Sequence, residues 1–165
     1  MGLFGSSAPV QLNSSVQSAI SSAFREDVVG PKHYRKMIAK IGAEQGDLLR
    51  TLGTRELLAL IAPCSTHGSY EGLLVLTNQR VMDFKNGHVR GQMALDNVVH
   101  SKLGSHPGGF VVLQLTGRNY VPYSAGMDKF ALAEYQRNHL QVSIQGVEVA
   151  RNVIGIIDGA CGIRD

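Results

Sequence analysis

The sequence has only two cysteines, Cys64 and Cys161, among its 165 residues. They lie far apart and neither belongs to a Cys-x-x-Cys pair, so a disulfide framework and a thiolate metal site have little support. No uninterrupted apolar run approaches the ~18 residues that indicate a membrane span. The N-terminus also lacks a cationic region followed by a long apolar segment. We therefore expect a cytoplasmic protein.

Charge is also sparse, because charged residues make up 18% of the chain and hydrophobic residues make up 44%. This balance predicts a globular protein with enough apolar material for a core. The formal charge of +3 and the pI near 9.0 are only mildly basic. A dedicated nucleic-acid binder has a denser set of Lys and Arg, so we expect no nucleic-acid partner.

Residue groups that could carry out catalysis are not evident. No pairing for acid–base chemistry is recognisable among the carboxylates of Asp83, Asp96, Asp128, Glu134 and Glu148. The six histidines are dispersed and show no His-x-x-x-His spacing for zinc. The glycine-rich stretch 104–109 is followed by no Lys-Ser/Thr pair, so it reads as a hairpin turn and not as a phosphate-binding loop. We expect no enzyme activity, no metal and no cofactor.

The first third of the chain is predicted to be a flexible tail, residues 1–12, and a helical appendage, residues 13–53. Met1-Gly2-Leu3-Phe4-Gly5-Ser6 fits the loose form of an N-myristoylation signal, but a plain disordered terminus is the favoured interpretation. A short helix is expected between the possible N-caps at 13–15 and the stop at Gly30-Pro31, on the apolar stripe Val16, Ile20, Phe24 and Val28.

Pro31 can open a second helix, because a missing N–H is harmless in the first turn. Its apolar stripe consists of Tyr34, Met37, Ile38 and Ile41. Gly42 and Gly46 weaken the far end, and residues 48–52 suggest another turn or two before Gly53. The appendage could cover one face of a sheet or reach a partner, and the sequence leaves both open.

From residue 57 onward the pattern changes to short apolar runs separated by turn-forming residues, which is typical of an antiparallel sheet. Asn86-Gly87 can take positive φ at both central positions of a type I′ turn and predicts a tight hairpin. We expect six strands here, at Leu57–Ala62, Gly72–Leu76, Val81–Lys85, His88–Leu95, Val98–Leu103 and Phe110–Leu115. A loop is expected over Pro63–Ser69.

The segment 117–138 is predicted to be a loop containing a short helix over Asp128–Arg137, which is rich in helix formers. Alternation of apolar and polar residues over 140–145 favours a seventh strand, although residues 128–145 could instead be read as one helix. A last helix is expected over Val147–Ile157, ending at Gly159.

Seven antiparallel strands closed by a C-terminal helix give an α+β fold, and residues 54–165 are predicted to form this domain. The stretch 74–84, Leu-Val-Leu-Thr-Asn-Gln-Arg-Val-Met-Asp-Phe, resembles the turn and following strand of bacterial pleckstrin-homology-like and GRAM-type domains. Residues 55–60 resemble the start of the family's first strand, and 94–98 resemble its polar turn before the fifth. The resemblance covers about residues 48–158 and implies a seven-stranded barrel or sandwich with a C-terminal helix.

The resemblance also bears on ligands. Lipid-binding relatives commonly hold an inositol phosphate with a basic motif in the first hairpin, whereas residues 63–69 here contain no Lys or Arg, which argues against specific phosphoinositide binding. Thr77 and Arg80 match the family turn, and we expect both to stabilise it, Arg80 through loop carbonyls or through Asp83.

We therefore expect a noncatalytic adaptor that acts through a protein partner or through self-association. Its possible partner surface consists of Tyr120, Tyr123, Phe130 and Tyr135. The alternative is peripheral attachment to an anionic membrane through the basic residues of the second helix, Lys32, Arg35, Lys36 and Lys40. A solvated helix face is the simpler reading of these four residues.

Overall fold

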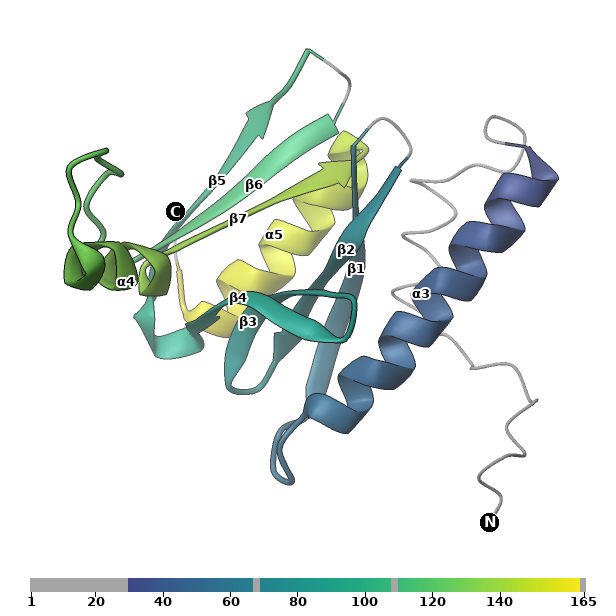
Figure 1. The fold of residues 1–165 in the computed structure, drawn as a ribbon, viewed down its shortest axis with the longest axis horizontal. Coiled ribbons are helices and arrows are strands. Elements are labelled where there is room, and N and C mark those ends of the chain that lie inside the picture. Colours follow the sequence, from purple (N-terminus) through teal and green to yellow (C-terminus); the bar gives the residue numbers. More distant parts are fainter. Residues whose placement is uncertain (1–29, 67–68, 108–109, 164–165) are drawn as a thin grey trace.

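The structure, a computed structural model, describes residues 30–66, 69–107 and 110–163. Two antiparallel sheets form its centre (Figure 1). The first has the order β1-β2-β3-β4 and the second the order β5-β6-β7. Neighbours in each sheet follow one another in the chain, so each sheet is a meander. The predicted tail, the predicted helix before Gly30 and the possible acylation signal lie outside the described residues.

Strands and helices alternate little along the described part of the chain, because most strands follow one another directly. The four-stranded sheet consists of β1 (Leu58–Thr66), β2 (Ser69–Thr77), β3 (Arg80–Lys85) and β4 (His88–Ala94). The 3₁₀ turn η2 (Leu95–Asn97) leads into β5 (Val98–Ser105), β6 (Phe110–Gly117) and β7 (His139–Gln145). The helices are α3 (Pro31–Thr51), α4 (Lys129–Arg137) and α5 (Val147–Cys161).

The inner faces of the two sheets and one face of α5 share an apolar core. Leu74 and Val81 come from the first sheet, Leu113 and Ile144 from the second, and Ile157 from α5. These side chains are fully buried. The strand alternation seen in the sequence therefore corresponds to a real inner face, and the C-terminal helix packs on the sheets as the resemblance implied. Neither sheet closes on itself.

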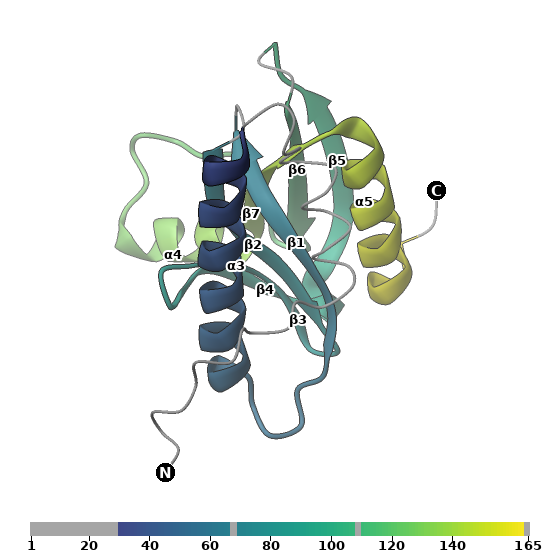
Figure 2. The ribbon, with the colours of Figure 1, turned by 90° about the vertical axis from the view of Figure 1, so that its right-hand side faces the viewer.

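A second core lies on the outer face of the first sheet, beneath α3. Ile41 and Leu48 of α3 pack with Val75, Met82 and Phe84 of the sheet, and each of these side chains is buried. Figure 2 shows α3 and α5 on opposite sides of the four-stranded sheet. Of the two possibilities left open by the sequence, α3 takes the first, because it covers a sheet face.

The hairpin between β3 and β4 turns where the sequence predicts it. Asn86 has φ 53° and Gly87 has φ 78°, so both residues use the positive φ values that a type I′ turn requires. The backbone N–H groups of both donate to the carboxylate of Glu44, which is buried on α3, with 3.2 Å from Gly87 N to Glu44 Oε2. One side chain thus fastens α3 to the tip of the hairpin.

One prediction about the N-terminal half was wrong and another was confirmed. The expected loop over 63–69 is mostly strand, because β1 runs through Pro63 to Thr66 and β2 already begins at Ser69. The helix expected from Pro31 to just before Gly53 is confirmed as α3, and its buried stripe on the sheet outweighs the weak helix propensity of Gly42 and Gly46.

The second half follows the predictions more closely. Residues 139–145 form a strand after a separate short helix, so the one-helix alternative for 128–145 was wrong. Helix α5 does not end at Gly159 but continues to Cys161, where Gly162 ends it with φ 73°. Glycine adopts this left-handed conformation without the steric cost that other residues incur.

Candidate functional site

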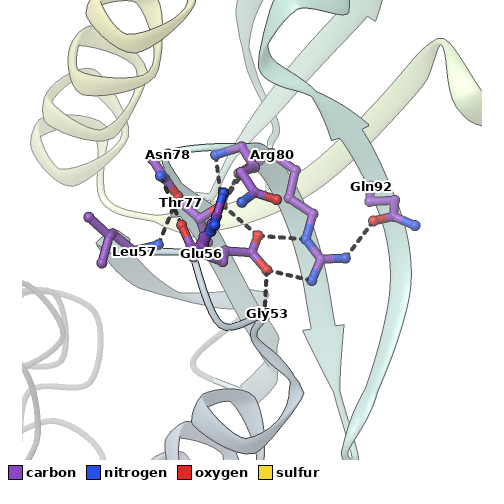
Figure 3. A network of polar contacts seen from close by, with 9 residues as sticks. Gly53, Glu56, Leu57, Thr77, Asn78, Arg80 and Gln92 are labelled. Carbon is purple, nitrogen blue, oxygen red and sulfur yellow. Dashed lines mark hydrogen bonds and ion pairs between the residues drawn. The ribbon is translucent and has the colours of Figure 1, made fainter.

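A buried ion pair anchors the turn between β2 and β3, close to the start of β1 (Figure 3). Arg80 Nε donates to Glu56 Oε2 over 2.8 Å, and Arg80 Nη2 donates to Glu56 Oε1 over 2.9 Å. Thr77 Oγ1 donates to Glu56 Oε2 over 2.7 Å. The hydrogen bonds from Arg80, and next the one from Thr77, lower the pKa of Glu56 to about 2, although burial of the carboxyl acts in the opposite direction. Glu56 is therefore a carboxylate held in place, not an acid–base group.

Thr77 and Asn78 also hold the turn through the backbone. Thr77 Oγ1 accepts from the N–H groups of Gln79 and Arg80, each over 3.1 Å. Asn78 Oδ1 accepts from Leu57 N over 2.7 Å, which ties the turn to the start of β1. These contacts stabilise the turn, because the side-chain oxygens of Thr77 and Asn78 accept hydrogen bonds from the protein's own backbone.

The expected pair between Arg80 and Asp83 does not form. Arg80 binds Glu56, whereas Asp83 Oδ1 accepts from Arg90 Nη2 over 2.8 Å. Arg80 is the first residue of β3, directly after the turn, and its side chain contacts Glu56 in the segment before β1. Asp83 lies three residues further along the strand, and side chains an odd number of positions apart point to opposite faces. The sequence pattern did not reveal the role of Glu56, because its partners lie 21 and 24 residues further along the chain.

Three of the four predicted partner-surface residues meet around His139, at the start of β7. The centre of the His139 ring lies 4.9 Å from the centre of the Tyr135 ring and 5.7 Å from the centre of the Tyr120 ring. Tyr123 lies 5.7 Å from Tyr135. Burial in this aromatic cluster lowers the pKa of His139 and raises that of Tyr135. The three tyrosines and His139 therefore form one aromatic cluster beside α4, and Phe130 is not part of it.

Helix α4 is fastened to the sheets by polar contacts at its C-terminal end. Buried Asn138 donates through Nδ2 to the Glu134 carbonyl over 2.8 Å and accepts through Oδ1 from Asn97 Nδ2 over 3.0 Å. The Asn138 carbonyl accepts from Gly117 N over 2.9 Å. A Cβ on Gly117 would collide with both asparagine side chains, so glycine is required for this close approach.

Helix α4 and the loop before it expose large apolar side chains. Phe130 is 83% exposed, Tyr123 is 62% exposed and Val121 is 60% exposed, and Leu132 of the helix is 37% exposed. None of the nine residues of α4 is buried. Figure 1 shows α4 and its loop projecting from the end of the second sheet. The insertion therefore presents an apolar surface, which we call the α4 surface and define by Val121, Tyr123, Phe130 and Leu132.

The basic residues of α3 have exposed side chains. Lys32, Arg35 and Lys36 are exposed, and the Lys40 ammonium lies 5.5 Å from the centre of the Tyr70 ring of β2, so Lys40 reaches back over the sheet. Among the described residues, none of the four pairs with a carboxylate. Helical spacing puts Lys32, Lys36 and Lys40 on one face of α3, and their contact with an anionic partner stays a prediction.

The surface of the described part of the chain has a mainly polar cavity beside β7 and a mainly apolar cavity beside α4. One, of about 420 Å³, lies between the first sheet and β7 and is lined by Cys64, Glu71, Asp83 and Arg90 among others. Burial raises the pKa of the Cys64 thiol far above its ordinary value, so the thiol stays protonated and unreactive. The other, of about 360 Å³, lies beside the C-terminal end of α4 and is lined in part by Arg80 and Arg137.

Within the described residues, no three His, Cys, Asp or Glu side chains are arranged to hold a metal ion. None of the described helices has the length and apolar character that crossing a bilayer requires.

No protein-family profile and no curated protein sequence matches this chain. Among solved structures, the chain is similar to the crystal structure of a pleckstrin homology domain from Shewanella amazonensis SB2B. The two share 15% identity with a TM-score of 0.43, over 73% of this chain and 87% of that chain. A similarity of this size supports no statement about what this chain binds. The narrower resemblance to bacterial GRAM-type domains stays a prediction.

Proposed function

We propose that this chain is a noncatalytic binding module that recognises a protein partner through the α4 surface. The observation that carries the proposal is a helix that buries none of its own residues while Phe130 stands 83% exposed at its start. Several large apolar side chains exposed within one short segment, residues 121–132, form the kind of surface that a partner covers. Aromatic side chains are also the commonest anchors of protein interfaces.

The polar contacts at Asn138 support the same proposal. A nine-residue helix is too short to be stable by itself in water, so α4 depends on its attachments. Those attachments hold the C-terminal end by hydrogen bonds and leave the apolar side chains of the α4 surface free. A surface that is already fixed before binding loses less conformational entropy when a partner docks.

Substitution of Phe130 tests the proposal. We expect Phe130→Glu to melt like the parent, because its side chain packs on almost nothing, and to weaken partner binding at least about thirtyfold, as loss of an interface anchor does. Leu57→Glu is the matched control, since Leu57 is 68% exposed but lies away from α4, immediately before β1. The partner would be isolated from native cells by affinity purification, and its affinity for each purified variant measured by calorimetry.

Sedimentation equilibrium of the purified chain identifies the kind of partner. A dimer that Phe130→Glu dissociates and Leu57→Glu preserves would make the partner a second copy of this chain. A monomer throughout, with a captured protein that binds the Leu57 variant but not the Phe130 variant, would make the partner a different protein. Equal affinity of both variants for that protein, with no dimer, would contradict the proposal.

A second candidate function is attachment to an anionic membrane surface through α3. The supporting observation is that Lys32, Arg35 and Lys36 are exposed and pair with no carboxylate in the described part of the chain. Each basic residue near such a surface contributes about 1 kcal/mol. Binding to phosphatidylserine vesicles at low salt that Lys32→Gln with Lys36→Gln abolishes, and Lys129→Gln does not, would favour this function.

A further inference from the structure

The cavity of about 360 Å³ beside α4 lies where several elements end. Its walls come from the start of β3, the end of β4, η2 and the last residue of α4. Ligand sites in proteins begin at about 300 Å³, so one side chain of a peptide fits such a space. The cavity adjoins the helix that carries the α4 surface.

The lining of this cavity is mainly apolar, and Arg80 and Gln92 add hydrogen-bond donors to it. Arg80 Nη1 donates to Gln92 Oε1 over 2.7 Å, which uses one of the two lone pairs of that oxygen (Figure 3). Gln92 therefore keeps both amide N–H groups for a ligand, together with the second lone pair of its oxygen. Glu56 fixes the Arg80 guanidinium from behind, and each terminal nitrogen of that guanidinium keeps one hydrogen without a partner among the described residues.

A second arginine, Arg137, also lines the cavity. Arg137 ends α4, its ion pair among the described residues is with Glu134 on the preceding turn, and its side chain is 65% exposed. Asn97 holds the Arg137 carbonyl through Nδ2 over 3.3 Å, while its own Oδ1 accepts from Arg118 N over 3.2 Å. The Asn97 side chain is therefore occupied by the protein and serves to position the end of α4.

The lining contains two arginines and no acidic residue, and buried Met93 supplies an apolar floor. Guanidinium and amide N–H groups around an apolar base suit a carboxylate carried on a short apolar or methylene stem. We propose that this cavity binds a carboxylate of the partner polypeptide, from an acidic side chain or from a chain terminus. The assignment rests on the proposed protein-binding function, because the cavity lies at the C-terminal end of the helix that carries Phe130 and Leu132.

Small carboxylates test the cavity without the partner. We would titrate the isotope-labelled full chain with N-acetyl-leucine, which has a free terminal carboxylate, and with N-acetyl-glutamic acid α-amide, which has a side-chain carboxylate. The Gln92 side-chain amide and the Met93 methyl signals report binding by NMR. The expected result is a saturable shift of both signals with a dissociation constant in the millimolar range, and the tighter of the two probes identifies the source of the carboxylate.

The neutral counterparts of these probes, N-acetyl-leucinamide and N-acetyl-glutamine α-amide, should leave both signals unchanged. Equal shifts with the neutral probes, no saturable shift with either acid, or tighter binding of inorganic phosphate than of both acids would overturn the assignment. Raising the salt concentration should weaken the acids, because the attraction is between charges.

Two substitutions locate the binding. Gln92→Glu keeps an oxygen for Arg80 but replaces the donors with a negative charge, and Arg137→Gln removes a charge from an exposed side chain. Each should weaken the acids about tenfold or more, the cost of losing a hydrogen bond to a charged group. Gln141→Glu and Arg50→Gln are the controls, since Gln141 is an exposed strand glutamine and Arg50 pairs with Asp47 on α3 with the same spacing as Arg137 and Glu134. An equal loss in the controls would refute the site.

The outcomes for the cavity and for the α4 surface are separable. Phe130→Glu should leave the affinity for the small acids unchanged, because Phe130 does not line the cavity. Gln92→Glu should weaken the partner as well as the acids. If the acids bind but Phe130→Glu has no effect on the partner, the proposed function fails while the cavity stands. If the partner depends on Phe130 but the acids do not bind, only the cavity assignment fails.

Discussion

Replacing Glu56 with glutamine should destabilise the fold by about 2 kcal/mol at neutral pH. The lowering of the Glu56 pKa from 4.5 to about 2 corresponds to roughly 3 kcal/mol of stabilisation. Arg80, the partner of this carboxylate, is 23% exposed in its side chain. Solvent screening at Arg80 therefore reduces the expected loss to about 2 kcal/mol. Urea denaturation of the parent and of Glu56→Gln at pH 7 measures the difference.

The pH dependence has a defined direction. Because the pKa of Glu56 is lower in the folded than in the unfolded chain, ionised Glu56 contributes its full stabilisation above about pH 4.5. That contribution is lost as the pH falls from there toward about 2. The stability gap between the parent and Glu56→Gln should therefore narrow over this range, whereas a gap caused by a packing defect would not change with pH.

Glu148→Gln is the control for this experiment. Glu148 Oε1 lies 3.9 Å from Arg151 Nη1 on α5, and 88% of the Glu148 side chain is exposed. Exposed ion pairs of this kind contribute little to the free energy of unfolding. It should denature like the parent at every pH. A Glu56→Gln variant as stable as Glu148→Gln at pH 7, or a gap that stays constant down to pH 2, would refute the role assigned to the ion pair.

Two further predictions concern the buried strands and the contact of Glu44 with the hairpin tip. Val75→Asp and Leu113→Asp should each cost more than about 4 kcal/mol and abolish cooperative melting, because both side chains are fully buried and a charge there has no partner; a melting temperature near that of the parent would contradict their placement. Glu44→Gln should cost about 1–2 kcal/mol, because the N–H groups of Asn86 and Gly87 would share a neutral amide in place of a carboxylate. Hydrogen exchange of these two amides should accelerate, and unchanged exchange would show that Glu44 does not fasten the turn.

Local chemistry was sufficient to predict the meander. Asn86-Gly87 fixes the register of one hairpin through its own backbone conformation, and the alternation over 140–145 gives β7 its inner and outer faces. Phe110 and Val98 begin strands where the apolar runs begin. Each of these features depends on residues that are close in sequence, which is the range at which pattern and propensity act.

Pro63 and Gly72 show why the first hairpin was underestimated. Both residues interrupt a strand pattern, so the sequence predicts a loop between the strands. In the structure Pro63 lies in β1, which is an edge strand of its sheet and so tolerates a residue without an N–H. Gly72 pairs with Cys64 at an irregularity of the register, with φ 120° and with the Phe84 carbonyl only 2.8 Å from where its Cβ would lie. Gly72 therefore serves an irregularity of the register, Pro63 is accommodated at the edge of the sheet, and neither residue ends its strand.

The partner of Arg80 could not be predicted for a different reason. Glu56 precedes Arg80 by 24 residues and lies outside any strand or helix, so neither spacing nor periodicity connects the two. Only the pairing of β1 with β2 brings the segment before β1 next to the turn after β2. Long-range polar contacts of this kind follow from topology, and they become predictable once the strand order is known.

The same hydrogen bonds from Asn97 hold the α4 surface and place Arg137 at the cavity. Asn97 contacts both Asn138, which holds the helix, and the Arg137 carbonyl, which places that arginine at the wall of the cavity. Because the same residue fixes both, the distance between the Arg137 backbone and the cavity wall does not depend on a partner being bound. A partner that lays an apolar side chain against Phe130 could therefore present a carboxylate to Arg137 without rearranging the helix. This is why affinity gained at the α4 surface and affinity gained at the cavity should add within one interface, and a double substitution of Phe130 and Gln92 should weaken the partner by the product of the two single effects.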